Sequence, residues 1–267
     1  MDKPIAAITG ASAGIGSVFA RKLAAQGYNL LLVARRQDRL QQLAAELEHA
    51  HQIHVETCEA DLSVPDDMDR VAARLAAESR LDLLVNNAGF GVKGRFYEAP
   101  LDDQLKMHRL HIGAILRLTH AALGAMAARG RGAIINVASV AGFTRSPGSV
   151  SYCATKAWVN AFTEGLYLDL KSTGSPVVVQ ALCPGFTYSE FHDVAGIERS
   201  SIPKSYWMSA ESVVDASLAG LRQRKLFVVP GWKYKLIVGL VNRIPQRLRL
   251  VLESRAPHNR ARLPERG

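Results

Sequence analysis

Short apolar segments alternate with longer segments of helical periodicity along most of the chain. The apolar segments are rich in Val, Ile, Leu and Ala and show no polar face, which is typical of parallel strands buried on both sides. The predicted strands are residues 5–9, 29–34, 53–57, 81–89, 133–139 and 177–182, with a further one at 227–231. The predicted helices are residues 14–26, 38–50, 66–79, 101–129, 151–173 and 210–223. This order predicts an α/β fold in which helices cover both faces of a parallel sheet of about seven strands.

The same pattern predicts a single domain. We find no internal repeat and no low-complexity linker in the 267 residues. The alternation of strands and helices continues to residue 231, so we expect one doubly wound domain over residues 1–231. Residues 232–267 follow it as a basic, partly apolar C-terminal extension.

Composition indicates a globular protein. Apolar residues make up 48% of the chain and charged residues 21%, which is typical of a folded domain. The longest apolar runs, such as "LLLV" at 30–33, are far shorter than the ~20 residues that span a bilayer. The start, "MDKPIAAITGAS", enters a predicted strand directly, so we expect no leader and a cytoplasmic location. Cys58, Cys153 and Cys183 are scattered and form no CxxC pair, so we expect neither a disulfide framework nor a metal site.

The net charge of +9 lies mostly in the C-terminal extension. From Trp232 onward, nine Lys and Arg face two Glu, a local balance of +7. The preceding domain is nearly neutral, so we expect no nucleic-acid partner. The extension interleaves apolar and basic residues, which leaves two interpretations. It makes weak peripheral contact with an anionic membrane, with Trp232 and Tyr234 at the boundary, or its apolar side covers the domain or a sister subunit, which we favour.

A glycine-rich turn joins the first predicted strand to the first predicted helix. Gly10, Gly14 and Gly16 follow Thr9 in the spacing T-G-x-x-x-G-x-G. Glycine at such a turn allows the backbone to approach a pyrophosphate, and the helix N-terminus adds partial positive charge. The strand, turn and helix stand in the expected order, so the turn predicts a dinucleotide site.

Four further motifs follow in order: "NNAG" at 86–89, Ser139 at the end of the fifth predicted strand, "YCATK" at 152–156 and "PG" at 184–185. With the glycine turn, they make the chain resemble the short-chain dehydrogenase/reductase family over residues 4–231. The resemblance implies a Rossmann fold, a nicotinamide cofactor, and a homodimer or homotetramer formed through helices 101–129 and 151–173.

The end of the second predicted strand indicates which cofactor binds. Dinucleotide folds that bind NAD usually place an acid there, whereas this chain has Arg35 and Arg36. A guanidinium suits the extra phosphate of NADP, although a solvated basic pair that opens a helix is the alternative. We therefore expect NADP(H). The resemblance implies cofactor contacts from Gly10, Ser12, Gly14, Ile15, Gly16, Arg35, Arg36, Asp61, Leu62, Asn87, Ala88, Gly89, Tyr152, Lys156, Pro184, Gly185, Phe186 and Thr187.

Tyr152 and Lys156 are four residues apart and share one helix face. A nearby ammonium lowers the pKa of a phenol, as does an oxidised nicotinamide, so the pair is expected to serve as general acid or base near neutrality. Alone, this spacing would indicate core packing. The resemblance implies that Ser139 polarises the substrate carbonyl and that Lys156 also bonds the nicotinamide ribose.

Three histidines stand in "HRLHIGAILRLTH" at 108–120. The family usually has an asparagine near the position of His111, where it holds a water that links the lysine to solvent. An imidazole there leaves three interpretations: a proton relay among the catalytic residues, structural packing, or a ligand. A metal is disfavoured because no carboxylate or cysteine cluster joins His108 and His111. His120 is expected to pack or to face solvent.

The residues and the resemblance together imply an NADPH-dependent reductase of a ketone or aldehyde, reversible as an alcohol dehydrogenase. Several aromatic residues suggest a pocket for a small apolar carbonyl substrate, although each could instead pack the covering helices: Phe90, Phe143, Phe186, Tyr188, Phe191 and Trp207. Aliphatic or aromatic ketones, 3-oxoacyl thioesters and steroid-like ketones remain open. The alternative is a catalytically weak protein that senses the cofactor or serves as a scaffold, an interpretation favoured by His111 alone.

Overall fold

The computed structural model describes residues 3–191, 200 and 202–254. All pairings in its seven-stranded sheet are parallel, in the order β3-β2-β1-β4-β5-β6-β7. The strands are β1 (Ile5–Thr9), β2 (Asn29–Ala34), β3 (Val55–Glu59), β4 (Leu81–Asn86), β5 (Ala133–Val137), β6 (Val178–Leu182) and β7 (Phe227–Val228). The predicted α/β fold with a parallel, doubly wound sheet is confirmed.

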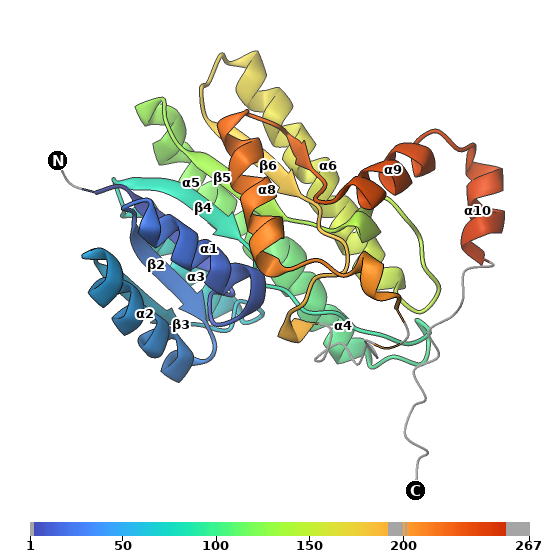
Figure 1. Cartoon of the computed structure of the whole chain (residues 1–267). Helices are drawn as coiled ribbons and strands as arrows, with labels where there is room; N and C mark the ends of the chain where they lie inside the picture. The colour runs from blue at the N-terminus through green and yellow to red at the C-terminus, as the bar shows by residue number, and fades with distance from the viewer. Residues whose placement is uncertain (1–2, 192–199, 201, 255–267) are drawn as a thin grey trace, which may run out of the picture.

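Helices cover both faces of the sheet (Figure 1). One apolar core lies between the sheet and α1 (Gly14–Ala25), α2 (Gln37–His51) and α8 (Ala210–Arg222). A second core lies under α3 (Pro65–Ala76), α5 (Ile115–Arg129) and the C-terminal part of α6 (Val150–Ser172). Successive residues of β1 alternate between them, with Ala6 and Ile8 in the first core and Ile5 and Ala7 in the second. Burial on both faces explains why the strands show no polar alternation in sequence.

Five predicted strands differ from the observed ones, and in two of them the difference is only one or two residues at one end: the fifth ends at Val137 and the sixth begins at Val178. The third strand begins at Val55 instead of residue 53, because α2 runs to His51 and Gln52 ends it in the left-handed conformation with φ of 49°. The fourth ends at Asn86, since Asn87 turns toward the glycine turn and donates its backbone N–H to Thr9 Oγ1 over 2.9 Å. The seventh is only two residues long.

The predicted helix at 101–129 is continuous but has an irregular centre. A π-helical segment (Arg109–Ala114) lies between α4 (Leu101–His108) and α5. By length and composition this helix could cross a membrane. Its Leu118, Ala122 and Met126 belong to the core beneath α3 and α5, so its apolar character is that of a core helix in an α/β domain.

Two helices follow the sheet: α9 (Trp232–Val241) and α10 (Gln246–Ser254). They lie beyond α6 and α8, away from β3 (Figure 1). The break between them precedes Pro245, as expected from the proline. The rest of the extension, residues 255–267, lies outside the described residues.

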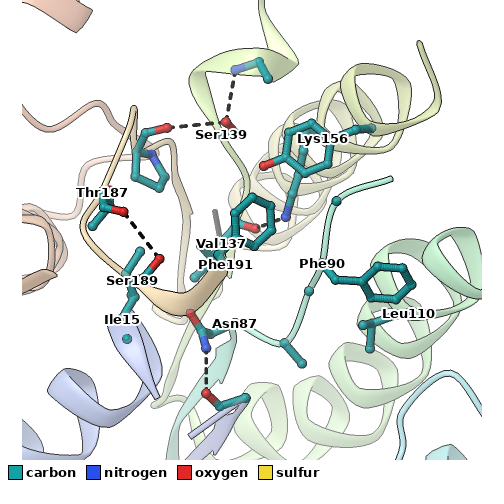
Figure 2. Close-up of a pocket in the computed structure, with 18 of the residues that line it drawn as sticks. Ile15, Asn87, Phe90, Leu110, Val137, Ser139, Lys156, Thr187, Ser189 and Phe191 are labelled. Atoms are coloured by element: carbon teal, nitrogen blue, oxygen red, sulfur yellow. Dashed lines mark hydrogen bonds between the residues drawn. The ribbon is translucent and has the colours of Figure 1, made fainter. Parts of the chain in front are cut away.

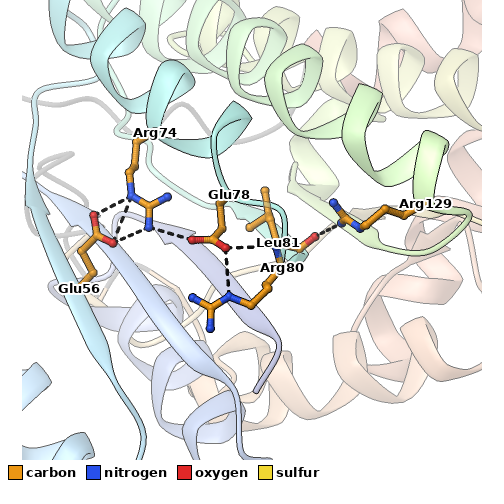
Figure 3. Close-up of polar contacts among 6 residues, drawn as sticks. All are labelled: Glu56, Arg74, Glu78, Arg80, Leu81 and Arg129. Carbon is orange, nitrogen blue, oxygen red and sulfur yellow. Dashed lines mark hydrogen bonds and ion pairs between the residues drawn. The ribbon is translucent and has the colours of Figure 1, made fainter. Parts of the chain in front are cut away.

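A charged network fixes α3 against the sheet (Figure 3). Arg74 on α3 binds both carboxylate oxygens of Glu56 on β3, with N···O distances of 2.9 and 2.7 Å. Arg74 also donates to Glu78 over 3.0 Å, and Glu78 accepts the backbone N–H of Arg80 over 3.1 Å. Arg129 at the end of α5 donates to the carbonyl of Leu81. These contacts bind the N-terminal end of β4 to its neighbours.

Candidate active site

The carboxyl ends of the central strands open into a groove with a volume of about 660 Å³. The chain order reverses between β1 and β4, and open α/β sheets bind ligands at such a switch point. Every predicted cofactor-binding residue except Gly16 lines the groove. Ser139, Tyr152 and Lys156 line it as well, so the structure brings together residues far apart in sequence.

The glycine turn has the conformation that its sequence predicts. Gly10 and Gly14 have φ of 67° and 55°, in the left-handed region that favours glycine. Gly16 lies beneath the turn instead of in the groove, where a Cβ would stand 2.3 Å from the carbonyl oxygen of Gly10. Ala13 precedes α1 and has no polar side chain to cap the first N–H groups of that helix. The N-terminus of α1 therefore fits an anionic diphosphate.

Thr9 connects the glycine turn to the NNAG motif. Its hydroxyl oxygen accepts the backbone N–H groups of Asn87 and Ala88, over 2.9 and 3.0 Å. The side-chain amide of Asn87 donates back to the carbonyl oxygens of Thr9 and Gly10, over 2.9 and 3.2 Å. Two walls of the groove are thus held at a fixed separation.

The arginines after β2 lie at the opposite end of the groove from Tyr152. Arg35 and Arg36 line it beside Ser12, whose hydroxyl accepts Arg36 Nη2 over 3.2 Å. Asp61 also lines the groove, and its carboxylate accepts both the backbone N–H and the hydroxyl of Ser63, over 2.9 and 2.8 Å. Sequence reasoning missed Glu190, which forms an ion pair with Arg36.

The other end of the groove holds the predicted reacting groups. Ser139 precedes a short 3-10 helix (Val140–Gly142), and its hydroxyl accepts the N–H of Ala141 over 3.1 Å. Lys156 Nζ donates to the carbonyl oxygen of Val137 over 2.8 Å (Figure 2). That ammonium lies 5.9 Å from the centre of the Tyr152 ring. The phenol and the ammonium lie about one turn apart on α6, and the Ser139 hydroxyl lies near the phenol.

Burial dominates the proton affinities of the two groups. It raises the pKa of Tyr152 to about 12, although the nearby Ser139 hydroxyl acts in the opposite direction. Burial lowers the pKa of Lys156 to about 8, against an opposing effect of Cys183. Desolvation of the phenolate therefore dominates the pKa of Tyr152 within the protein chain, whereas the predicted lowering also depends on an oxidised nicotinamide.

Comparison with known proteins decides the family. The family model for short chain dehydrogenases matches residues 4–198, which is most of the chain. This chain belongs to the short-chain dehydrogenase/reductase family. Its members are oxidoreductases, and the Rossmann fold implied by the resemblance is the one observed.

Three members of the family illustrate the similarity. The very-long-chain 3-oxoacyl-CoA reductase of Rattus norvegicus is 30% identical over 248 residues, 91% of this chain and 75% of the relative. A short-chain dehydrogenase from Sphingobium yanoikuyae, solved with NADPH, is 35% identical, with a TM-score of 0.83 over 97% of this chain and 98% of that chain. The bulky-bulky ketone specific alcohol dehydrogenase from Comamonas testosteroni is 32% identical, with a TM-score of 0.78 over 92% and 96%.

His111, which the resemblance places near the family's usual asparagine, lies in the π-helical segment between α4 and α5. The ring is completely buried, and its Nε2 accepts the backbone N–H of Phe90 over 3.3 Å. Because Nε2 is the acceptor, Nδ1 carries the proton and donates to Thr155 Oγ1 over 2.9 Å. Thr155 in turn donates to the carbonyl oxygen of Tyr152 over 2.9 Å. Burial, followed by the charges of Lys156 and His108, lowers the pKa of His111 well below its usual value.

These contacts bear on the three interpretations of His111. Both ring nitrogens bond protein groups, and the residue lies outside the set that lines the groove. The neutral ring therefore fits structural packing better than a proton relay. It also explains Gly89, where a Cβ would stand 2.8 Å from His111 Nε2. Among the described residues, no three His, Cys, Asp or Glu side chains group as a metal site would require, and His120 is exposed.

Only half of the predicted aromatic pocket faces the groove. Phe90, Phe186 and Phe191 line it, and the ring of Phe191 lies 5.8 Å from that of Tyr152. The other three aromatic residues are not among the lining residues. Phe143 packs on Phe227 with ring centres 6.0 Å apart, and Tyr188 stacks on Trp207 at 5.0 Å. For these three the alternative of packing was the right interpretation.

The C-terminal extension reaches the loop that follows β6. The hydroxyl of Tyr234 on α9 accepts the backbone N–H of Phe186 over 3.0 Å and donates to the carbonyl of Tyr206 over 2.7 Å. The Tyr234 ring fills the space beside Gly185, where a Cβ would lie 2.0 Å from it. The N–H of Phe186 therefore does not point to the groove.

Thr187 is the member of this loop that can face a cofactor amide. The residues on either side of it bond Met208, over 2.9 Å from Met208 N to Phe186 O and 2.9 Å from Tyr188 N to Met208 O. In a parallel bridge of this kind the backbone N–H and C=O of Thr187 point away from Met208. That side is the groove, which Thr187 lines.

Proposed function

We propose that the protein is an NADPH-dependent carbonyl reductase that acts on apolar ketones or aldehydes, with alcohol oxidation as the reverse reaction. One observation carries the proposal: Ser139, Tyr152 and Lys156 meet at one end of a groove that fits a dinucleotide. Burial raises the pKa of Tyr152 to about 12, which favours the protonated phenol at neutral pH. A protonated phenol is the form that reduction of a carbonyl requires of a general acid.

The preference for NADP(H) is supported by charge. The groove has Arg35 and Arg36 after β2, where a carboxylate would otherwise meet the ribose of NAD. Guanidinium groups bind phosphate through paired hydrogen bonds. The Sphingobium yanoikuyae relative was solved with NADPH, which agrees with this assignment.

The residues of this chain supply the proton that the carbonyl oxygen takes up, and they position the substrate. Bound NADPH would supply the hydride. Tyr152 donates its proton to the carbonyl oxygen, and the Ser139 hydroxyl donates a hydrogen bond to the same oxygen as its negative charge develops. Lys156 is held by the carbonyl oxygen of Val137. In this proposal it bonds the nicotinamide ribose and passes a proton from solvent back to Tyr152 after each reduction.

An apolar substrate is supported by the wall near Tyr152, which includes Phe90, Leu110 and Phe191. The relatives from Comamonas testosteroni and Rattus norvegicus are named for a bulky ketone and a very-long-chain 3-oxoacyl thioester. We propose a carbonyl with large apolar substituents. The alternative of a cofactor-sensing or scaffold protein depended on His111, and no contact of that residue favours it.

We also propose that the enzyme is a cytoplasmic homodimer or homotetramer. A cytoplasmic supply of NADPH would favour reduction over oxidation. Exposed apolar side chains on α4, α5 and α6 support association through these helices: Leu101, Leu105, Leu116, Val150 and Leu168.

The test uses the full chain and a panel of aliphatic, aromatic, steroid-like and 3-oxoacyl substrates, with NADPH consumption as the readout. Tyr152→Phe is expected to bind NADPH like the wild type and to reduce carbonyls about 10²–10⁴-fold more slowly, because only the proton donor is lost. Tyr97→Phe, an exposed tyrosine outside the groove, is the control. Near-normal turnover by Tyr152→Phe would contradict the proposal.

A further inference from the structure

The segment Ser189–Phe191 lies along the whole groove. Its first residue packs on the glycine turn, where a Cβ on Gly14 would stand 3.0 Å from Ser189 Cβ. Its last residue packs on Tyr152, with ring centres 5.8 Å apart. Figure 2 shows Ser189 near Ile15, with Phe191 farther along the pocket. Glu190 stands between them, and its carboxylate reaches Arg36 and Arg39.

Glu190 binds two arginines that follow β2. Its Oε2 lies 2.8 Å from Arg36 Nη1, and its Oε1 lies 2.5 Å from Arg39 Nη1. Hydrogen bonds from Arg39 and then Arg36 lower the pKa of Glu190, so the carboxylate is ionised at neutral pH. Arg36 contacts Ser12 through Nε and Nη2 and Glu190 through Nη1.

This arrangement bears on the choice between the two nicotinamide dinucleotides. The 2′-phosphate of NADP(H) needs the guanidinium that Glu190 already binds, and the two anions repel each other. The ribose hydroxyl of NAD(H) carries no charge and can donate a hydrogen bond to a carboxylate. Glu190 thus supplies from the loop after β6 the acid that is missing after β2.

We propose that Glu190 is a specificity-determining residue that competes with the 2′-phosphate of NADP(H) for Arg36 and narrows the preference for NADP(H) over NAD(H). The inference rests on the proposed function, because it assumes that the adenosine end of the cofactor lies beside Arg36. Glu190 affects only which cofactor binds; the roles of Ser139, Tyr152 and Lys156 do not depend on it.

The test compares wild type with Glu190→Gln, which keeps the shape of the side chain and removes its charge. Dissociation constants for NADPH, NADH and adenosine 2′,5′-bisphosphate are measured on the full chain by fluorescence and calorimetric titration. Exposed ion pairs contribute at most about 1 kcal/mol, so the variant is expected to bind NADPH and the bisphosphate about three- to fivefold more tightly. NADH should bind equally or less tightly, so the preference for NADPH widens.

The matched control is Glu46→Gln, which removes the exposed ion pair with Arg21 outside the groove and should leave all three constants unchanged. Unchanged or weaker NADPH binding in Glu190→Gln, with a wild type that binds NADPH, would overturn this inference alone. Equal tightening for NADPH and NADH would also overturn it, because charge at the 2′ position would then not be the cause. A wild type that binds neither dinucleotide would overturn both this inference and the proposed function.

Discussion

The imidazole of His111 joins two segments of the active site to its own π-helical segment without facing the groove. It holds the backbone of Phe90 after the NNAG motif and, through Thr155, the first turns of α6 that carry Tyr152. A neutral ring with both nitrogens bonded keeps these segments in register across a wide range of pH. We therefore regard His111 as a positioning residue.

Replacement of His111 by Leu is expected to lower the free energy of unfolding by about 1–3 kcal/mol, because buried polar groups of Phe90 and Thr155 lose their partner. Chemical unfolding measures this loss. His111→Asn, which keeps a donor and an acceptor, should recover part of it. The pH profile of turnover should keep its shape in both variants, and a shifted profile at unchanged stability would favour the relay instead.

At the scale of single elements, the turn from α3 to β4 depends on Glu78. This side chain is 8% exposed and accepts hydrogen bonds from the Arg80 backbone and from Arg74. Burial by itself would raise the pKa of Glu78, but these bonds outweigh it and the pKa is lowered. A lowered pKa in the folded state means that the carboxylate stabilises the fold when ionised.

Glu78→Gln is expected to cost about 1–3 kcal/mol of unfolding free energy at neutral pH. The advantage of the wild type should be complete above the carboxyl's unfolded pKa of about 4.3 and should shrink as pH falls through the lower folded value. Urea unfolding at several pH values measures it. Asp69→Asn, which removes the exposed ion pair with Arg117 on the same helix layer, should change stability by about 0.5 kcal/mol or less. A pH-independent cost for Glu78→Gln would contradict the role of its charge.

The contact between α9 and the loop after β6 is expected to affect NADPH binding. Tyr234→Phe removes the acceptor of the Phe186 N–H, so this loop should be held less firmly. The loss of one hydrogen bond of about 1 kcal/mol is expected to raise the KM for NADPH roughly fivefold. Steady-state kinetics measure it, with Tyr97→Phe as the control. Unchanged KM would show that the loop keeps its position without the hydroxyl.

The elements show what sequence can and cannot predict. Strand and helix order followed from patterns within short windows, and the glycine turn, Ser139, Tyr152 and Lys156 belong to motifs with fixed spacing. The π-helical segment around His111 carries no local signal that distinguishes it from α-helix. For Phe143, Tyr188 and Trp207 the sequence left pocket and packing open, because apolar character does not say which way a side chain points. Glu190 and Tyr234 meet their partners only through the tertiary fold.

At the scale of the whole molecule, two exposed apolar surfaces need an explanation. One is the face of α5 and α6 that includes Leu116 and Leu168, which are 49% and 58% exposed. The other is the outer side of α9, where Trp232, Leu236 and Leu240 stand four residues apart. On its inner side α9 buries Tyr234 and Val238. This side of the extension therefore packs on the domain, which is one of the two interpretations of the sequence. A membrane or a sister subunit remains the proposed partner of the outer side.

Association through α5 and α6 predicts that Leu116→Glu with Leu168→Glu will reduce the mass of the particle to that of one chain. The reason is that two carboxylates would be buried without partners in the interface. Light scattering coupled to gel filtration measures the mass. Leu236→Glu tests the outer side of α9 separately, and a loss of mass in that variant alone would assign the interface to the extension instead.

The close approach of Tyr234 to Gly185 has a practical consequence for protein engineering. A chimera that takes its last forty or so residues from a different reductase would place an unmatched surface behind the loop after β6, even if every motif residue were kept. The two positions should therefore be exchanged as a pair, and a library that varies one while fixing the other would sample mostly damaged variants.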